Sequence, residues 1–240
     1  MIDFEKLQPE KILFLDIETV PYYSNFREVP ERVQKLWDTK SNYFRKEDET
    51  PEDVYRRAGI YAEFGKIICI SAGYIQPKEG KHFFRIKSFF GHDESLVLSQ
   101  FKSLLDSSFQ SKNHLLCAHN GKEFDFPFLC RRYLINNIKL PTILNISGKK
   151  PWEVKHLDTM EMWKFGDYKN YTSLELLATV FNIETPKDDI TGADVWRVYW
   201  EEKNLDRIVE YCQKDVITVA QIFLRMQSLD TIEKNNIIYT

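Results

Sequence analysis

Three short apolar segments constrain most strongly what this chain can fold into. They are rich in isoleucine, leucine and phenylalanine, have the length of single strands, and lie at Lys11–Asp16, Lys66–Ile75 and Lys81–Phe89. The turn between the last two is short and contains Pro77 and Gly80, so we expect these two segments to pair as an antiparallel hairpin. The first ninety residues therefore predict a β-sheet and not a bundle of helices.

The rest of the chain alternates between helical and strand-like patterns. Apolar residues at helical spacing predict a helix at Glu94–Leu105, a short apolar run predicts a strand at Leu115–Ala118, and a second helix follows at Asp125–Asn136. Residues 139–157 are predicted to form a loop and the remainder to be helical. The helices predicted there are Thr172–Asn182, capped by its first residue, Gly192–Glu202 and Leu205–Gln227. This order is typical of an α/β domain with a mixed sheet flanked by helices.

A polar, aromatic stretch separates the first predicted strand from the second. Within it, Val29–Trp37 and Pro51–Arg57 have the character of short helices, each beginning near a proline that suits the first helical turn. The stretch is longer than a plain connection between strands. We therefore expect a single domain over residues 1–240 with a helical insertion at about 21–62.

Composition and charge exclude several classes of protein. The net charge of −3 argues against a broad basic face that wraps a duplex, but an enzyme that holds one strand end needs only a few local cations. The four cysteines form no CxxC pair, which argues against a zinc ribbon and favours reduced thiols. No apolar run approaches the ~20 residues of a membrane span. We expect no membrane partner and a cytoplasmic location.

The first group of chemically interesting residues is the pair Asp16 and Glu18. Residues two apart on a strand point to the same face, so both carboxylates are expected to emerge together at the end of the first strand. Two such groups repel one another unless a cation lies between them. On its own the motif is a weak signal, and a solvated strand end explains it better.

A second group lies at the junction between the strand Leu115–Ala118 and the helix after it. Asn120 and Asp125 occupy this junction, beside the carboxyl ends of the strands, where ligand sites collect in α/β sheets. The alternative is structural, because an aspartate at the start of a helix commonly satisfies free backbone N–H groups.

The third group is on the last long helix. Tyr211 and Asp215 are four residues apart and therefore share one face. Apolar neighbours predict that this helix packs against the core, where a tyrosine is most often structural. A buried aspartate is harder to explain, because an unpaired carboxylate is costly there unless a metal or a partner is present.

The combination of these groups is more specific than any one of them. A strand, a junction and a late helix each contribute carboxylates, namely Asp16, Glu18, Asp125 and Asp215. Hard oxygen ligands of this kind suit magnesium or manganese and not zinc. Carboxylates that hold two divalent cations form the standard site for displacement at phosphorus. We therefore expect two divalent cations, Mg or Mn, as cofactors.

Three segments carry a resemblance to a known superfamily. FLDIET (14–19), HNGKEFD (119–125) and YCQKD (211–215) resemble, in order and spacing, the exonuclease motifs of the DEDD (DnaQ-like) superfamily in its tyrosine-bearing branch. The likeness is to the proofreading domains of family-B DNA polymerases, but no polymerase domain follows. The chain therefore resembles the stand-alone predicted polymerase-B-like exonucleases, and the resemblance implies a ribonuclease-H-like fold.

The resemblance also implies an activity and a role for each motif residue. Asp16, Glu18 and Asp215 would hold the metal that activates water, Asp16 would bridge to a second metal reached by Asp125, and Tyr211 would orient the water. The implied reaction is 3′-to-5′ hydrolysis of a nucleic-acid end, with single-stranded DNA favoured, RNA as the alternative, and a role in repair or proofreading. The protein partner is unknown.

Two other classes of function stay open at this point. One is a catalytically silent module that grips strand ends, and the other is a phosphodiesterase that acts on dinucleotides. The complete set of four carboxylates and the tyrosine favours an active enzyme over the first.

Further residues near the motifs are expected to contact the substrate. They are Thr19, Asn120, Lys122 and Phe124. The phenylalanine could equally pack in the core and the lysine could simply be solvated. Asp158 and the pair Asp188–Asp189 are expected to be exposed or capping acids, and His119 and His156 to be structural residues.

Overall fold

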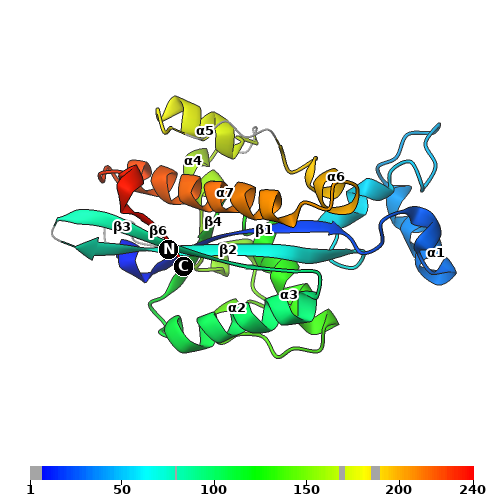
Figure 1. The fold of residues 1–240 in the computed structure, drawn as a ribbon, viewed down its shortest axis with the longest axis horizontal. Helices are drawn as coiled ribbons and strands as arrows, with labels where there is room; N and C mark the ends of the chain where they lie inside the picture. The colour runs from blue at the N-terminus through cyan, green and yellow to red at the C-terminus, as the bar shows by residue number, and fades with distance from the viewer. Residues whose placement is uncertain (1–6, 79, 168–170, 185–189) are drawn as a thin grey trace.

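The computed structural model describes residues 7–78, 80–167, 171–184 and 190–240, and within them a six-stranded sheet lies between two layers of helices (Figure 1). The strand order is β5-β4-β1-β2-β3-β6. The strands are β1 (Ile12–Pro21), β2 (Gly65–Lys78), β3 (Lys81–Phe90), β4 (Leu115–Ala118), β5 (Leu157–Asp158) and β6 (Ile237–Tyr239). The first three pair antiparallel, and β4, β5 and β6 each join their neighbour in parallel, which confirms the predicted mixed sheet.

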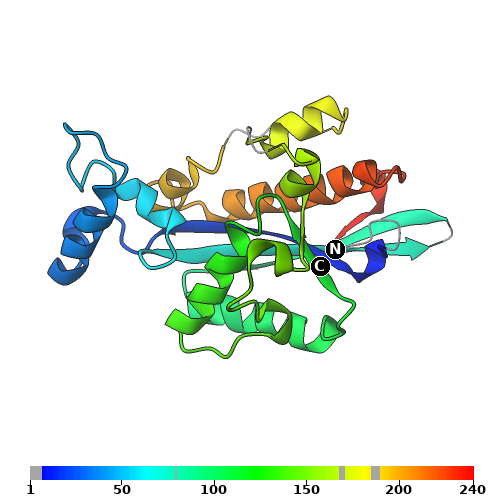
Figure 2. The same cartoon turned by 180° about the vertical axis from the view of Figure 1, so that it is seen from behind.

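The helices divide between the two faces of the sheet, as Figures 1 and 2 show from opposite sides. On one face lie α4 (Thr159–Lys164), α5 (Leu174–Val180), α6 (Val195–Trp200) and α7 (Leu205–Met226), and on the other lie α2 (Glu94–Ser108) and α3 (Asp125–Ile135). Among the described residues, every helix is too short or too polar to span a lipid bilayer.

Successive side chains of β1 point alternately toward the two layers of helices. Leu13, Leu15 and Ile17 join the core against α2 and α3, whereas Ile12 and Phe14 join the core beneath α7. Successive side chains of a strand point to opposite faces, so the next even-numbered positions also belong to the α7 face. Those positions are the ones that carry the carboxylates of the first motif.

The segment between β1 and β2 forms a small structure with its own core. It contains α1 (Glu31–Ser41) and a 3-10 helix at Tyr55–Ile60, and it extends beyond the end of the sheet (Figure 1). Trp37 is fully buried here, and its indole N–H donates to the carbonyl of Pro51 at 2.8 Å. The rings that surround it are Phe44, Tyr55, Tyr61 and Phe64.

Several element boundaries differ from the sequence-based predictions. The predicted helix Pro51–Arg57 is displaced: residues 51–54 form a turn in which the Asp53 carboxylate accepts hydrogen bonds from the Thr50 backbone and hydroxyl, and a 3-10 helix follows at Tyr55–Ile60. The predicted cap Thr172 is wrong: Ser173 caps α5 by accepting from the Leu176 N–H at 3.2 Å. The strands β5 and β6 were not predicted, because two or three residues carry no usable alternation.

Candidate active site

The middle of β1 presents two carboxylates to the α7 face. The strand runs on to Pro21 and pairs with β2 from Leu13 to that residue, so the prediction that Asp16 and Glu18 mark its end is wrong. Strand pairing continues past the acids because Ile17 and Val20 still provide buried apolar contacts. A register shift directly after Glu18 interrupts the regular ladder. Glu18 is buried and Asp16 keeps partial contact with solvent.

The first half of α7 lies over these carboxylates and adds two groups of the third motif. Asp215 is half-buried, and the Tyr211 hydroxyl donates a hydrogen bond to its carboxylate. Between them on the same side lies Cys212, whose thiol approaches Asp16 Oδ2 at 3.4 Å. Ligand atoms of Asp16, Glu18 and Cys212 all lie within 4.8 Å of one another. The cysteine was not predicted as part of the site, because without a CxxC partner it was expected to be a reduced thiol with no role in the chemistry.

The second motif reaches β1 from the other layer. β4 pairs with β1 only as far as Phe14, so the next part of that edge of β1 has no strand beside it. Asp125, the first residue of α3, is 2% exposed and its Oδ1 accepts the Ile17 backbone N–H at 3.2 Å. The helix N-cap is Phe124, which makes no side-chain capping bond. The Asp125 carboxylate therefore links α3 to the strand that carries the first motif.

The carboxylates of the site raise one another's pKa. Burial raises the pKa of Asp16 well above its usual value, and the charges of Asp125 and Asp215 raise it further. Burial likewise raises the pKa of Glu18, with Asp16 as the next cause. Burial is also the main reason that the pKa of Asp125 rises to about 7. Each of these groups is thus destabilised as an anion in the absence of a cation.

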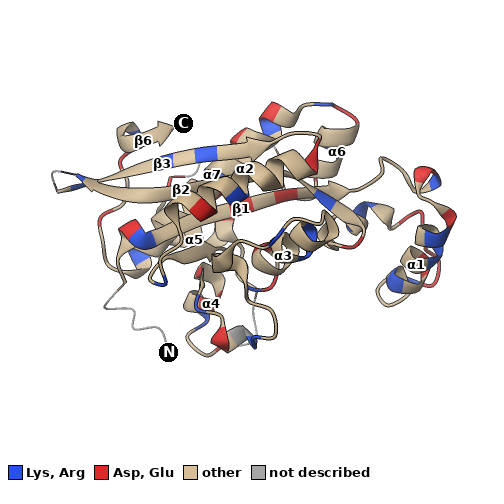
Figure 3. Ribbon diagram, turned by 90° about the horizontal axis from the view of Figure 1, so that it is seen from below, with Lys and Arg blue, Asp and Glu red and all other residues tan. Residues whose placement is uncertain are grey.

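Three of these carboxylates lack an ion-pair partner among the described residues. None of the described Lys or Arg residues forms an ion pair with Asp16, Glu18 or Asp125. Lys and Arg positions are scattered over the other elements, while β1 carries acidic positions in its middle (Figure 3). Converging oxygen donors without a cationic neighbour fit a hard divalent cation, which would relieve their mutual repulsion.

Asp158 organises the loop that precedes Asp125. It is buried, and its carboxylate accepts the backbone N–H groups of Asn120 and Lys122 at 3.0 and 3.1 Å. It also caps α4 through the N–H groups of Met160 and Glu161. Asp158 was expected to be an exposed or a capping acid. The capping role is confirmed, and the residue is buried and not exposed because β5 places it beside β4. The pair Asp188–Asp189 lies outside the described residues.

Asn120 has an unusual environment in this loop. Its backbone adopts a left-handed conformation with φ of 61°, and its side-chain Oδ1 is buried with no hydrogen-bond partner among the described residues. Asparagine tolerates this conformation better than most residues. A buried acceptor without a partner is uncommon and is consistent with a group that awaits a ligand.

The other predicted contact residues each have a partner within the protein. The Thr19 hydroxyl donates to the carbonyl of Gly59 at 2.8 Å, and Lys122 pairs with Glu161. Phe124 is half-buried against the α2–α3 core, with its ring centroid 5.4 Å from that of Phe128. Their contacts with substrate therefore stay predictions.

Both histidines near the site are structural, as expected. His119 contacts the Thr159 hydroxyl and the Thr172 carbonyl through its two ring nitrogens, each at 2.9 Å. His156 is buried, accepts the Leu116 N–H and donates to the Ile143 carbonyl. Burial lowers its pKa to about 4, so it stays neutral at ordinary pH.

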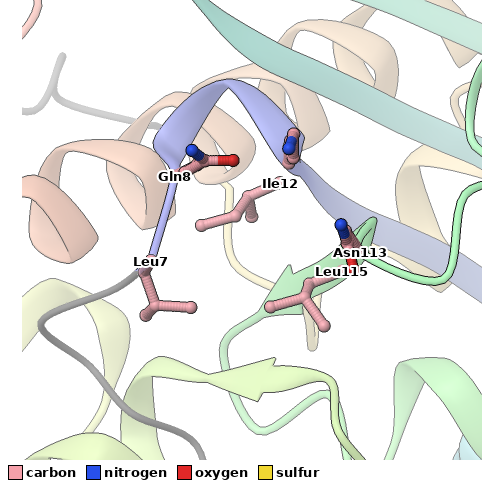
Figure 4. Close-up of a pocket in the computed structure, with 6 residues that line it drawn as sticks. Leu7, Gln8, Ile12, Asn113 and Leu115 are labelled. Carbon is pink, nitrogen blue, oxygen red and sulfur yellow. The ribbon is translucent and has the colours of Figure 1, made fainter.

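A recess at the start of β1 is separate from this site. It has a volume of about 490 Å³ and lies where β1 and β4 begin (Figure 4). Its lining residues are Leu7, Gln8, Lys11, Ile12, Asn113 and Leu115. They include no carboxylate, so the recess offers none of the chemistry of the acidic cluster.

Replacement of Gly121 by alanine is expected to disturb the site through its supporting loop. An added Cβ would overlap that of Ala118 and lie 3.1 Å from the Phe126 ring, so the loop before Asp125 must shift. We expect a loss of about 1–3 kcal/mol in the free energy of unfolding, typical of overpacking, together with reduced activity. Thermal denaturation and kcat would be compared with Gly192→Ala, where the added carbon meets nothing. Equal behaviour of the two variants would contradict the prediction.

Comparison with known proteins agrees with this arrangement. A family described as a predicted 3′–5′ exonuclease related to the exonuclease domain of PolB matches residues 60–237. The match includes the second and third motifs and begins after the strand that carries Asp16 and Glu18. No curated protein matches the chain. The mixed sheet flanked by helices is the ribonuclease-H-like fold that the resemblance implied, and exonuclease domains of this kind use divalent metals. The chain therefore belongs to this family of predicted 3′–5′ exonucleases, which are hydrolases that act on nucleic acid.

Proposed function

We propose that the protein removes nucleotides one at a time from the 3′ end of single-stranded DNA, and that Asp16, Glu18, Asp125 and Asp215 form its catalytic centre. The observation that carries this proposal is the convergence of carboxylates from β1, α3 and α7. Three of them have raised pKa values caused by burial and by mutual repulsion. Such an arrangement is unfavourable in a metal-free protein and therefore needs a functional reason.

The donor set fits the metals that the family implies. Asp16, Glu18 and Asp215 would hold one divalent cation, and Asp16 with Asp125 would hold a second. When bound, two such cations supply activation of a water molecule and stabilisation of the charge on the phosphate. The Cys212 thiol donates toward Asp16 Oδ2 and the Ile17 N–H donates to Asp125, so both carboxylates are oriented before any ligand arrives.

Tyr211 would position the attacking water and not remove its proton. Burial and the neighbouring carboxylates raise the pKa of its phenol far above the ordinary value, so the hydroxyl retains its proton. It can therefore donate a hydrogen bond, as it does to Asp215. In the proposed reaction the same hydroxyl would hold the water beside the scissile phosphate.

Tyr211→Phe is expected to lower kcat by about 10- to 100-fold, the usual effect of losing a group that orients a metal-site ligand. KM should change little, because the ring and the ligands remain. Steady-state kinetics on a labelled oligonucleotide would measure both constants, with the melting temperature as a check on folding. An unchanged kcat in a folded variant would show that the hydroxyl has no part in the reaction.

The stability of the metal-free protein is expected to fall as the pH rises. The pKa of Asp125 is about 7 in the folded state and near 4 in the unfolded chain, so the folded state binds more protons between these values. Stability gained in this way is complete below about pH 4 and is lost as the pH rises to about 7. Manganese should therefore raise the melting temperature more at pH 8 than at pH 5.5. Equal shifts at both pH values would contradict this prediction.

Matched DNA and RNA oligonucleotides test the proposed substrate. With a 5′ label and magnesium or manganese, single-stranded DNA should shorten one nucleotide at a time, and a blocked 3′ end should prevent this. If RNA is shortened faster than DNA, RNA and not DNA is the preferred substrate. Activity on dinucleotides alone would indicate a small-molecule phosphodiesterase. Binding of all strands without cleavage would indicate a silent module.

A further inference from the structure

Cys212 brings a sulfur donor to the acidic cluster, and the roles implied for the three motifs do not include it. Its thiol on α7 lies 3.4 Å from Asp16 Oδ2 and 3.5 Å from the Asp16 backbone carbonyl on β1. Ligand atoms of Asp16, Glu18 and Cys212 all lie within 4.8 Å of one another. Carboxylates alone suit a hard cation such as magnesium or manganese, whereas a thiolate favours zinc and softer metals. The cluster therefore combines two oxygen donors with one soft donor.

Glu18 provides a second and independent indication of a bound cation. The residue is only 7% exposed, and no described residue donates a hydrogen bond to its carboxylate or forms an ion pair with it. A buried carboxylate without a partner is costly, because its hydration is lost and nothing replaces it. Its ligand atom nevertheless converges with those of Asp16 and Cys212. A cation held by all three groups would supply the missing partner.

The spacing of the donors suits a tetrahedral metal site. Zinc binds cysteine sulfur at about 2.3 Å and carboxylate oxygen at about 2.0–2.2 Å, so a sulfur and an oxygen in one tetrahedral shell lie about 3.6 Å apart. The separation of Cys212 Sγ and Asp16 Oδ2 is already close to this value. The fold maintains it, because Phe14 of β1 packs in one buried cluster with Val216 and Val219 of α7.

We propose that Asp16, Glu18 and Cys212 bind one thiophilic divalent cation, of the class of zinc and cadmium, and that this cation inhibits the nuclease. On coordination the thiol releases its proton to solvent and no longer donates to Asp16. The two carboxylates that the proposed function assigns to magnesium or manganese are then occupied. The binding site stands on the donor geometry, whereas the inhibition rests on the proposed function.

Binding is tested on the metal-free protein without substrate. Titration with cadmium should produce the ultraviolet charge-transfer absorption of a cadmium–thiolate bond and should saturate at one cation per chain. Cys212→Ser should abolish this absorption and weaken zinc binding, measured by calorimetry, by more than ~10-fold, since even residues that only support a metal ligand contribute this much. Cys130→Ser removes a thiol on α3 that donates to the Leu144 carbonyl at 3.1 Å, and it should change neither quantity.

Three results would overturn the site. The first is the absence of cadmium–thiolate absorption in the wild-type protein, a result that depends on no variant. The second is a folded Cys212→Ser variant that binds zinc as tightly as wild type. The third concerns manganese, whose affinity should fall less than that of zinc in Cys212→Ser, because the oxygen ligands that manganese prefers remain. An equal loss for both metals would show that the thiol only supports Asp16.

Inhibition is tested by cleavage of single-stranded DNA in manganese with increasing zinc. Zinc in slight excess over the protein should stop cleavage by wild type, since zinc binds such sites more tightly than manganese does. Cys212→Ser should need more than ~10-fold as much zinc to lose half of its own uninhibited rate. Full-rate cleavage by the zinc-loaded protein would overturn the inhibition. If wild type cleaves no strand in any metal, the proposed function fails, while the cadmium titration still decides the site.

Discussion

Asp16→Asn is expected to abolish exonuclease activity and, in metal-free buffer at pH 8, to raise the melting temperature. The substitution would remove a charged metal ligand from the site. Removal of a residue that only supports a metal ligand already lowers activity ~10- to 100-fold, so for the ligand itself we expect a loss above ~100-fold. The gain in stability follows because the pKa of Asp16 is raised by burial and by the charges of Asp125 and Asp215. Removing its charge relieves that penalty.

The gain should appear as a rise in the melting temperature, because the folded state no longer holds a buried carboxylate whose pKa is raised. Thermal denaturation in chelator and a cleavage assay in manganese would measure the two effects on the same preparations. Asp230→Asn, an exposed aspartate away from the site, should change neither quantity. A variant that is both active and less stable would show that Asp16 is an ordinary structural residue.

Arg132→Met is expected to cause the largest loss of stability among the substitutions proposed. Arg132 lies on α3 and forms a two-bond ion pair with Glu94, the first residue of α2, and both are buried. Its remaining nitrogen donates to the carbonyl of Ala62 at 2.8 Å, and Glu94 also accepts the N–H of Ile67. Removal of one partner leaves an unpaired buried charge, which costs about 3–5 kcal/mol.

The melting temperature of Arg132→Met should accordingly fall by roughly 6–20 °C. Lys102→Met removes a more exposed pair with Asp106, and its effect should stay below about 1 kcal/mol. Addition of Glu94→Gln to Arg132→Met should restore part of the loss, because the second buried charge is also removed. If the double variant is destabilised by the sum of its parts, the charge is not the cause.

The face of β1 that carries the acids could be predicted from the sequence, but their place along the strand could not. Residues two apart on a strand share a face, so the spacing of Asp16 and Glu18 predicts that their carboxylates emerge together. The acids themselves suggested a strand end. In the structure the strand continues to Pro21 because β2 pairs with it from Leu13 to Pro21, a contact between residues some fifty positions apart.

Other features of the site depend on contacts that no local pattern reveals. Asp158 reaches the loop of Asn120 only because the two-residue strand β5 pairs with β4. Thr172 and Ser173 both suit a helix cap. In the structure Ser173 caps α5, and the Thr172 carbonyl contacts His119, fifty-three residues away in the chain. Cys212 is adjacent in sequence to Tyr211, yet its proximity to Asp16 appears only when α7 packs on β1.

The measurement that tests the central claim most directly is the rate of nucleotide release from the 3′ end of a 5′-labelled single-stranded DNA. It would compare the wild-type protein in magnesium or manganese, the same protein in chelator, and an Asp16→Asn, Asp215→Asn double variant in metal. The account predicts a ladder of products that shorten from the 3′ end in the first case and no cleavage in the other two. Cleavage that persists in the double variant, or in chelator, would place the activity outside the acidic cluster and contradict the account.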